Sequence, residues 1–144
     1  MGRRIVFAGG VLLAVVLLVA GCGGGSEEKE SEEGARTACK APALSGETGL
    51  PAAFPIPGEL TLTQTRKDGP STVVDGYWTA DLNEAYEKYK DQVEQAGYTI
   101  LFDEKEEDDA EISYKGSGRT GQIALREDCS ESDTTRVHIT NRPA

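Results

Sequence analysis

The chain has 144 residues, with 15 Lys or Arg against 25 Asp or Glu and one His, so its formal net charge at pH 7 is −10. This length allows one ordinary domain. The acidic balance argues against nucleic-acid binding, which depends on clustered Lys and Arg that neutralise phosphates. One His and three Cys also leave little material for histidine-based catalysis or for a zinc site with several ligands.

The first 21 residues are organised like an export signal. Two Arg at positions 3 and 4 precede an uncharged run over residues 5–25, within which small residues come just before Cys22. The segment Leu18-Val19-Ala20-Gly21-Cys22 resembles the lipobox of bacterial lipoprotein precursors. That resemblance implies cleavage after residue 21 and attachment of a diacylglyceryl group to Cys22, with further acylation of the new amino terminus.

An uncleaved transmembrane anchor is the alternative, because about 20 apolar residues are enough for a helix to cross a bilayer. Gly9 and Gly10 interrupt the run, and its small residues stand in register with Cys22, so we favour the lipoprotein interpretation. Lipid on Cys22 would hold the protein stably on a membrane, because two acyl chains bind far more strongly than one. We therefore expect a protein anchored to the bacterial cell membrane, with its domain on the extracytoplasmic side.

Two features follow the signal: a tether and a pair of cysteines. Residues 22–36 begin with the Cys22 expected to carry lipid and are otherwise Gly- and Glu-rich without apolar periodicity, which predicts a disordered acidic tether. Cys39 and Cys129 then remain as an even pair in a compartment that permits disulfides, and we predict a bridge between them. Free thiols or thiol catalysis are the alternatives, and no CxxC spacing or neighbouring His supports the latter.

Residues 37–144 have the pattern of a small α+β domain. Four Pro between residues 40 and 58 predict an extended lead-in, and residues 60–65 and 71–78 predict a hairpin. Asp81 and Glu84 match a capping box, and apolar residues at steps of three and four predict a helix over about 81–96. The helical positions are Leu82, Ala85, Tyr86, Tyr89, Val93 and Ala96.

Four short alternating segments follow the helix, at 98–102, 112–114, 123–125 and 137–139, with turns expected at 103–110, 115–118 and 128–133. We predict a mostly antiparallel sheet of five to six short strands packed on one amphipathic helix. The lead-in, the hairpin and the helix resemble the small extracytoplasmic domains of many bacterial lipoproteins, a resemblance that implies a fold and no particular activity.

Three patterns invite a chemical interpretation, and each has a simpler one. The segment Gly116-Ser-Gly118-Arg-Thr-Gly121 has the spacing of a dinucleotide-binding loop, but a strand pattern follows it where a helix is required. The acidic segment 103–111 could attract Ca²⁺, but it lacks EF-hand spacing and contains Lys105. His138 lies between apolar strand residues and should point away from the core. We predict no catalytic residue, no metal site and no cofactor.

These observations predict a non-enzymatic, lipid-anchored protein that has a partner-binding or accessory role in the cell envelope. Its small domain would bind an envelope protein or another surface partner. The alternative is a module that binds a small molecule or lipid in an apolar groove between sheet and helix, lined by Trp78, Phe102 and Tyr114. A large cavity at these side chains would favour a ligand, whereas a filled core with an exposed aromatic patch would favour a protein partner.

The lipid anchor is testable by metabolic labelling with a fatty-acid analogue in a bacterial host. The full chain should incorporate label, and a Cys22→Ala variant should lose it, because the sulfur of Cys22 is the expected attachment point. Equal labelling of the two proteins would refute the anchor.

Overall fold

The computed structural model describes residues 39–131 and 133–144. The expected signal (1–21), the lipidation site Cys22 and the tether (22–36) therefore lie outside the described residues. Within the described ranges, no helix has the length and hydropathy to cross a membrane.

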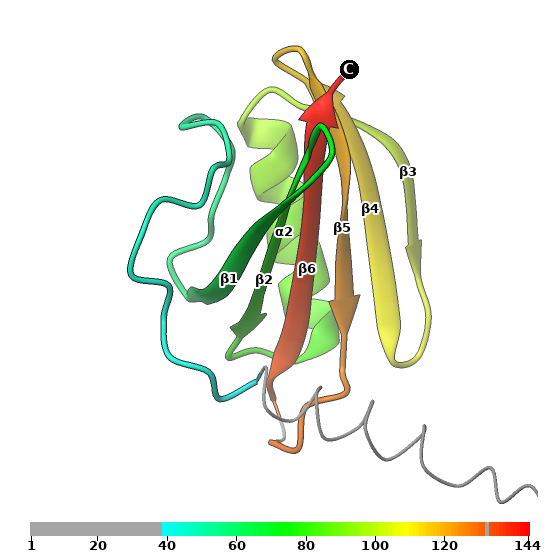
Figure 1. Ribbon diagram of the computed structural model, residues 1–144. Coiled ribbons are helices and arrows are strands. Elements are labelled where there is room, and N and C mark those ends of the chain that lie inside the picture. Colours follow the sequence, from blue (N-terminus) through cyan, green and yellow to red (C-terminus); the bar gives the residue numbers. More distant parts are fainter. Residues whose placement is uncertain (1–38, 132) are drawn as a thin grey trace, which may run out of the picture.

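The described residues form a six-stranded antiparallel sheet with one helix on one of its faces, an α+β arrangement (Figure 1). The elements are β1 (Leu60–Asp68), β2 (Ser71–Trp78), α2 (Leu82–Gln95), β3 (Thr99–Lys105), β4 (Asp109–Gly116), β5 (Arg119–Arg126) and β6 (Thr135–Pro143). The strand order is β1-β2-β6-β5-β4-β3, so the C-terminal strand lies between the hairpin β1–β2 and the meander β3–β4–β5. Figure 1 looks onto the face of the sheet opposite the helix, here called the open face.

The helix begins and ends where its sequence predicts. The backbone N–H of Glu84 donates to the Asp81 carboxylate at 2.8 Å, which satisfies one of the free amides at the helix start. The side chain of Glu84 pairs with Lys88 at 2.7 Å, so the reciprocal half of the expected capping box is replaced by a surface ion pair. At the other end, Gly97 follows the C-cap residue Ala96 with a φ of 84°, the left-handed conformation that glycine adopts without strain.

The core lies between α2 and the helix-facing side of the sheet. Alternate residues on the four central strands are buried there, in agreement with the period of two. Five of the six positions predicted from the 3.6-residue period are buried on α2, namely Leu82, Ala85, Tyr86, Tyr89 and Val93. The sixth, Ala96, is the C-cap residue and is half-buried. The fully buried strand residues include Val74, Ile112, Tyr114, Ile123, Leu125, Val137 and Ile139.

The helix is short, and its closest backbone neighbours are β3, β4 and β5. The lead-in, residues 39–59, helps to cover the remaining part of the same face. Phe54 packs against the rings of Tyr98 and Tyr114, with centroids 5.7 and 5.3 Å away. The lead-in also reaches the β1 edge, where the N–H of Leu44 donates to the carbonyl of Leu62 at 2.7 Å.

The turn predicted at residues 103–110 is shorter than expected, so that prediction is wrong in its bounds. Residues 103–105 continue β3 and residues 109–110 begin β4, so only 106–108 form the turn. The β3–β4 pairing extends into the acidic segment, where two charged residues of β3 form hydrogen bonds with the helix. The carboxylate of Asp103 accepts from Lys90, and the ammonium group of Lys105 donates to the side-chain oxygen of Asn83.

The glycine-rich segment 116–121 is part of the β4–β5 hairpin, and its glycines have structural roles. Ser117 and Gly118 both have positive φ, 51° and 69°, as a tight two-residue hairpin turn of type I′ requires. Gly121 lies on β5 directly against β6, where a Cβ would be 1.9 Å from the Thr140 carbonyl oxygen and 2.6 Å from the Tyr114 hydroxyl oxygen.

A Gly121→Ala variant should therefore be destabilised by about 3 kcal/mol, since the added methyl group meets backbone that cannot move freely. Gly46→Ala is the matched control, because nothing lies within 4 Å of its added Cβ, and it should change stability by less than about 0.5 kcal/mol. Urea unfolding, monitored by the fluorescence of the single Trp, which is the buried Trp78, measures the stability of both variants. Similar midpoints for the two variants would contradict the close approach.

Candidate functional site

Two of the three residues predicted to line a ligand groove, Trp78 and Tyr114, lie in the core and contact other side chains. Trp78 packs edge-to-face on Tyr89 with centroids 5.8 Å apart. The Tyr114 hydroxyl donates to the carbonyl of Thr140 and accepts from the amide of Asn141, both at 2.8 Å. Burial raises the pKa of Tyr114 to about 12. Protein side chains therefore fill the space beside both rings.

Phe102, the third residue, lies on the opposite face of the sheet and is 53% exposed. A β-bulge between Ile100 and Phe102 is the cause: Ile100 pairs with helix-facing Tyr114, and Phe102 pairs with Ser113 on the open face. Leu101 is the extra residue of the bulge. Ile100 and Phe102, which were expected on the same side of the sheet, therefore lie on opposite sides. The structure does not bring Phe102 together with Trp78 and Tyr114.

The exposed apolar surface that results lies on the outer strand of the sheet. Leu101 is 59% exposed and adjoins Phe102, on a strand that within the described part of the chain pairs only with β4. We call this strand, residues 99–105, the β3 edge; in Figure 1 no described segment runs along its outer side. The run Ile100-Leu101-Phe102 was the available sequence signal, because three consecutive apolar residues do not fit a strand with one solvated face.

Asp103 attaches the β3 edge to the helix. Its carboxylate accepts hydrogen bonds from Lys90 at 2.6 Å and from the Tyr86 hydroxyl. These hydrogen bonds hold the pKa of Asp103 below its usual value, and the bond from Lys90 has the larger effect. The bulge places Asp103 on the helix-facing side, where these partners are.

Beyond Asp103, acidic side chains gather around the β3–β4 turn. A shallow depression of about 200 Å³ is lined by Glu104, Glu106, Asp109 and Glu111. Glu104 and Glu111 are direct cross-strand neighbours, and Glu111 accepts a hydrogen bond from Gln122 at 2.7 Å. In the described part of the chain, these carboxylates do not converge into a three-ligand group. The turn gives the end of the β3 edge a strong negative charge.

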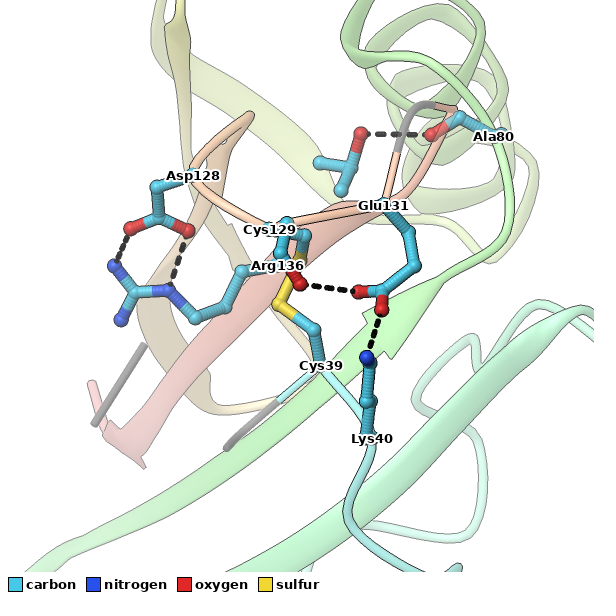
Figure 2. The surroundings of a disulfide bond; sticks show 9 residues. Cys39, Lys40, Ala80, Asp128, Cys129, Glu131 and Arg136 are labelled. Atoms are coloured by element: carbon cyan, nitrogen blue, oxygen red, sulfur yellow. Dashed lines mark hydrogen bonds and ion pairs between the residues drawn. A yellow bond between two sulfur atoms is a disulfide. The ribbon is translucent and has the colours of Figure 1, made fainter. Parts of the chain in front are cut away.

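The disulfide between Cys39 and Cys129 is present and ties the lead-in to the loop between β5 and β6 (Figure 2). Its Cα atoms are 5.7 Å apart, and the bridge closes a separation of 90 residues, which by chain entropy stabilises the fold by about 4.6 kcal/mol. Ion pairs flank it: Lys40 with Glu131, and Arg136 with Asp128 (Figure 2). The chain therefore enters the domain at a covalently fixed point, at the same end of the sheet as the acidic turn.

His138 projects from the open face as predicted, and it is bound there by a carboxylate. Its Nδ1 lies 2.5 Å from one oxygen of Asp75, and Arg66 Nη1 lies 2.6 Å from the other. Burial opposes ionisation of Asp75, but the hydrogen bonds and charges of His138 and Arg66 outweigh it, so the pKa of Asp75 is lowered. This network links β1, β2 and β6 across the open face.

No protein-family model matches this chain, and a comparison with curated proteins found no match to its sequence.

The Asp75 network makes stability depend on pH. Because the folded-state pKa of Asp75 is lowered, its stabilisation is complete above the unfolded pKa of about 4 and is lost as pH falls through the folded pKa. The free energy of unfolding should therefore decrease on acidification, and less steeply in Asp75→Asn.

Asp91→Asn, at an exposed helix position, removes the same charge as a control and should keep the wild-type pH dependence. Urea unfolding at a series of pH values between roughly 6 and 3 measures the slopes. Identical slopes for Asp75→Asn and the wild type would exclude this contribution.

Proposed function

We propose that this protein is a lipid-anchored extracytoplasmic protein of a bacterial cell membrane, and that its domain binds a protein partner through the β3 edge. The observation that carries the binding role is the exposed pair Leu101 and Phe102 on an edge strand whose outer side has no partner strand among the described residues. The lipobox-like segment ending at Cys22 supports the anchored location. The role is recognition without catalysis.

An edge strand offers unpaired backbone N–H and C=O groups, which an extended segment of another protein can pair with. The two edges of this sheet differ in this respect. At the β1 edge, the lead-in already donates a hydrogen bond from Leu44 to Leu62. At the β3 edge, two large apolar side chains are more than half exposed instead. An added strand there would find both backbone partners and apolar contacts.

The chemistry of the edge restricts its partner. Full burial of one Leu or Phe side chain contributes about 2 kcal/mol. Leu101 and Phe102 are already nearly half-buried, so burying the rest of both would contribute about 2 kcal/mol in total. Backbone pairing and charge contacts would have to supply the remainder of the affinity. The exposed carboxylates of Glu104, Glu106 and Glu107 follow directly. The partner segment should therefore be extended, with apolar side chains beside Leu101 and Phe102 and Lys or Arg beside the acidic turn.

Recognition of a small molecule between sheet and helix has less support. Trp78 and Tyr114 are 1% and 0% exposed. The ring of Trp78 packs against Tyr89, and the ring of Tyr114 packs against Phe54 and Tyr98. A ligand there would have to displace packed aromatic rings, whereas the β3 edge needs no rearrangement to accept a strand.

The β3 edge is testable by site-specific photocrosslinking in membranes of the native host. A photoreactive amino acid at position 101 should give a discrete crosslinked protein, whereas one at position 87, exposed on the helix, should not. Phe102→Ser should reduce the yield at position 101 by about tenfold or more, because its apolar contact is lost. Ile56→Ser removes another exposed apolar side chain, on the lead-in, and should leave the yield unchanged.

Hydrogen exchange on the isolated complex then locates the contact. The amides of residues 99–105 should gain protection on binding, since a paired edge no longer exchanges freely. Equal crosslinking at positions 101 and 87, or protection elsewhere with none in β3, would overturn the proposal.

A further inference from the structure

The open face carries a small cationic depression that is separate from the β3 edge. It has a volume of about 140 Å³ and is lined by Ala124, Arg126, Arg136 and His138, which lie on the neighbouring strands β5 and β6. Cross-strand pairing explains its form, because Ala124 lies directly between His138 on β6 and Glu111 on β4. The short Ala124 side chain forms the floor, and the longer side chains form the walls.

The charges around this depression are not balanced evenly. Asp128 accepts two hydrogen bonds from Arg136, through Nε at 2.9 Å and through Nη2. His138 is bound to Asp75. The Arg126 side chain is exposed and, among the described residues, has no hydrogen bond or ion pair, not even with its cross-strand neighbour Asp109. Arg126 is therefore an uncompensated cation in a protein that is acidic as a whole.

Arg126 also lies directly opposite Arg136 in the β5–β6 ladder. Like charges in this position repel each other and destabilise a sheet. Arg136 uses Nε and Nη2 for Asp128, so Nη1 has no partner among the described residues. The two side chains thus present free guanidinium N–H groups at one small depression, and an anion between them would relieve the repulsion.

The size and donors of the depression define the ligand. Pockets for larger organic ligands measure about 300 Å³ or more, whereas this one, at about 140 Å³, suits a single small group. Guanidinium groups bind the oxygens of carboxylates and phosphates in pairs, with charge-assisted hydrogen bonds. We infer that the open face binds one oxyanion group, a carboxylate or a phosphate, between Arg126 and Arg136 over Ala124.

The test is a titration of the full chain, in micelles of a zwitterionic detergent, followed by ¹⁵N-NMR of the Ala124 amide and the Arg126 side-chain N–H. Inorganic phosphate and acetate are added separately at constant ionic strength. Saturable shifts at these two groups are expected with at least one anion. Replacing the soluble anion by phosphatidylglycerol in the micelle distinguishes a lipid headgroup from a free oxyanion as the source.

Two variants with the same change in net charge separate a built site from general charge attraction. Arg126→Gln should weaken binding by about tenfold, the loss expected for a charge-assisted pair of hydrogen bonds. Arg142→Gln, an exposed residue toward the other end of β6, should bind as the wild type does. Shifts that grow linearly without saturation, or equal weakening by both variants, would overturn the inference. The result is independent of the β3 edge, whose crosslinking requires neither arginine.

Discussion

The backbone pairing of β6 with β2 on one side and β5 on the other holds the sheet together. Among the residues that the structure describes, no other ladder connects the β1–β2 hairpin to the β3–β4–β5 meander. An isolated hairpin is only marginally stable in water. The helix-facing residues of β6, Thr135, Val137, Ile139 and Asn141, are fully buried. At the start of this strand, the Thr135 hydroxyl donates to the carbonyl of Ala80 at 2.9 Å and so connects β6 to the entrance of the helix.

The central position of β6 also determines what the two faces of the sheet can do. The helix-facing side is a filled aromatic and aliphatic core, in which even the polar Asn141 is bound by Tyr114 and Arg119. The open face carries charged side chains that bond to one another across strands, as Asp75 does with His138. The two proposed binding surfaces therefore lie on the open face and at the β3 edge, and the core holds these parts of the sheet in place.

The bulge at Leu101 links the fold to the proposed binding surface. Without it, a period of two would keep Phe102 on the same side as Ile100 and turn Asp103 toward the open face. With it, Asp103 reaches Lys90 and Tyr86 on the helix, and Phe102 becomes exposed. The charged contact with the helix and the exposed aromatic ring are thus two results of one inserted residue. The disulfide fixes the other end of the described chain, so the point where the lead-in enters the domain is constant relative to this surface.

The sequence by itself determined the elements whose signals are local. Asp81 and the apolar spacing from Leu82 to Val93 specify the helix, and alternating residues specify the strands, because these patterns depend on backbone geometry over a few residues. The pairing of Cys39 with Cys129 followed from there being no other partner once Cys22 is assigned to lipid. The lipobox-like segment is equally local, and it lies outside the described residues.

Only the tertiary structure decided how these elements combine. No local pattern places the last strand in the centre of the sheet, because strand order is set by burial between distant segments. The exposure of Phe102 likewise depends on the bulge at Leu101, which also brings Asp103 to Lys90, 13 positions away. The cationic depression requires Arg126 and Arg136 to lie opposite each other in the β5–β6 ladder. The loop that connects these two strands contains the disulfide-bonded Cys129. The pairing register between strands decides which side chains lie on which face of the sheet, and one inserted residue moves the following side chains to the opposite face. This register depends on contacts between distant segments, and both proposed binding surfaces depend on it.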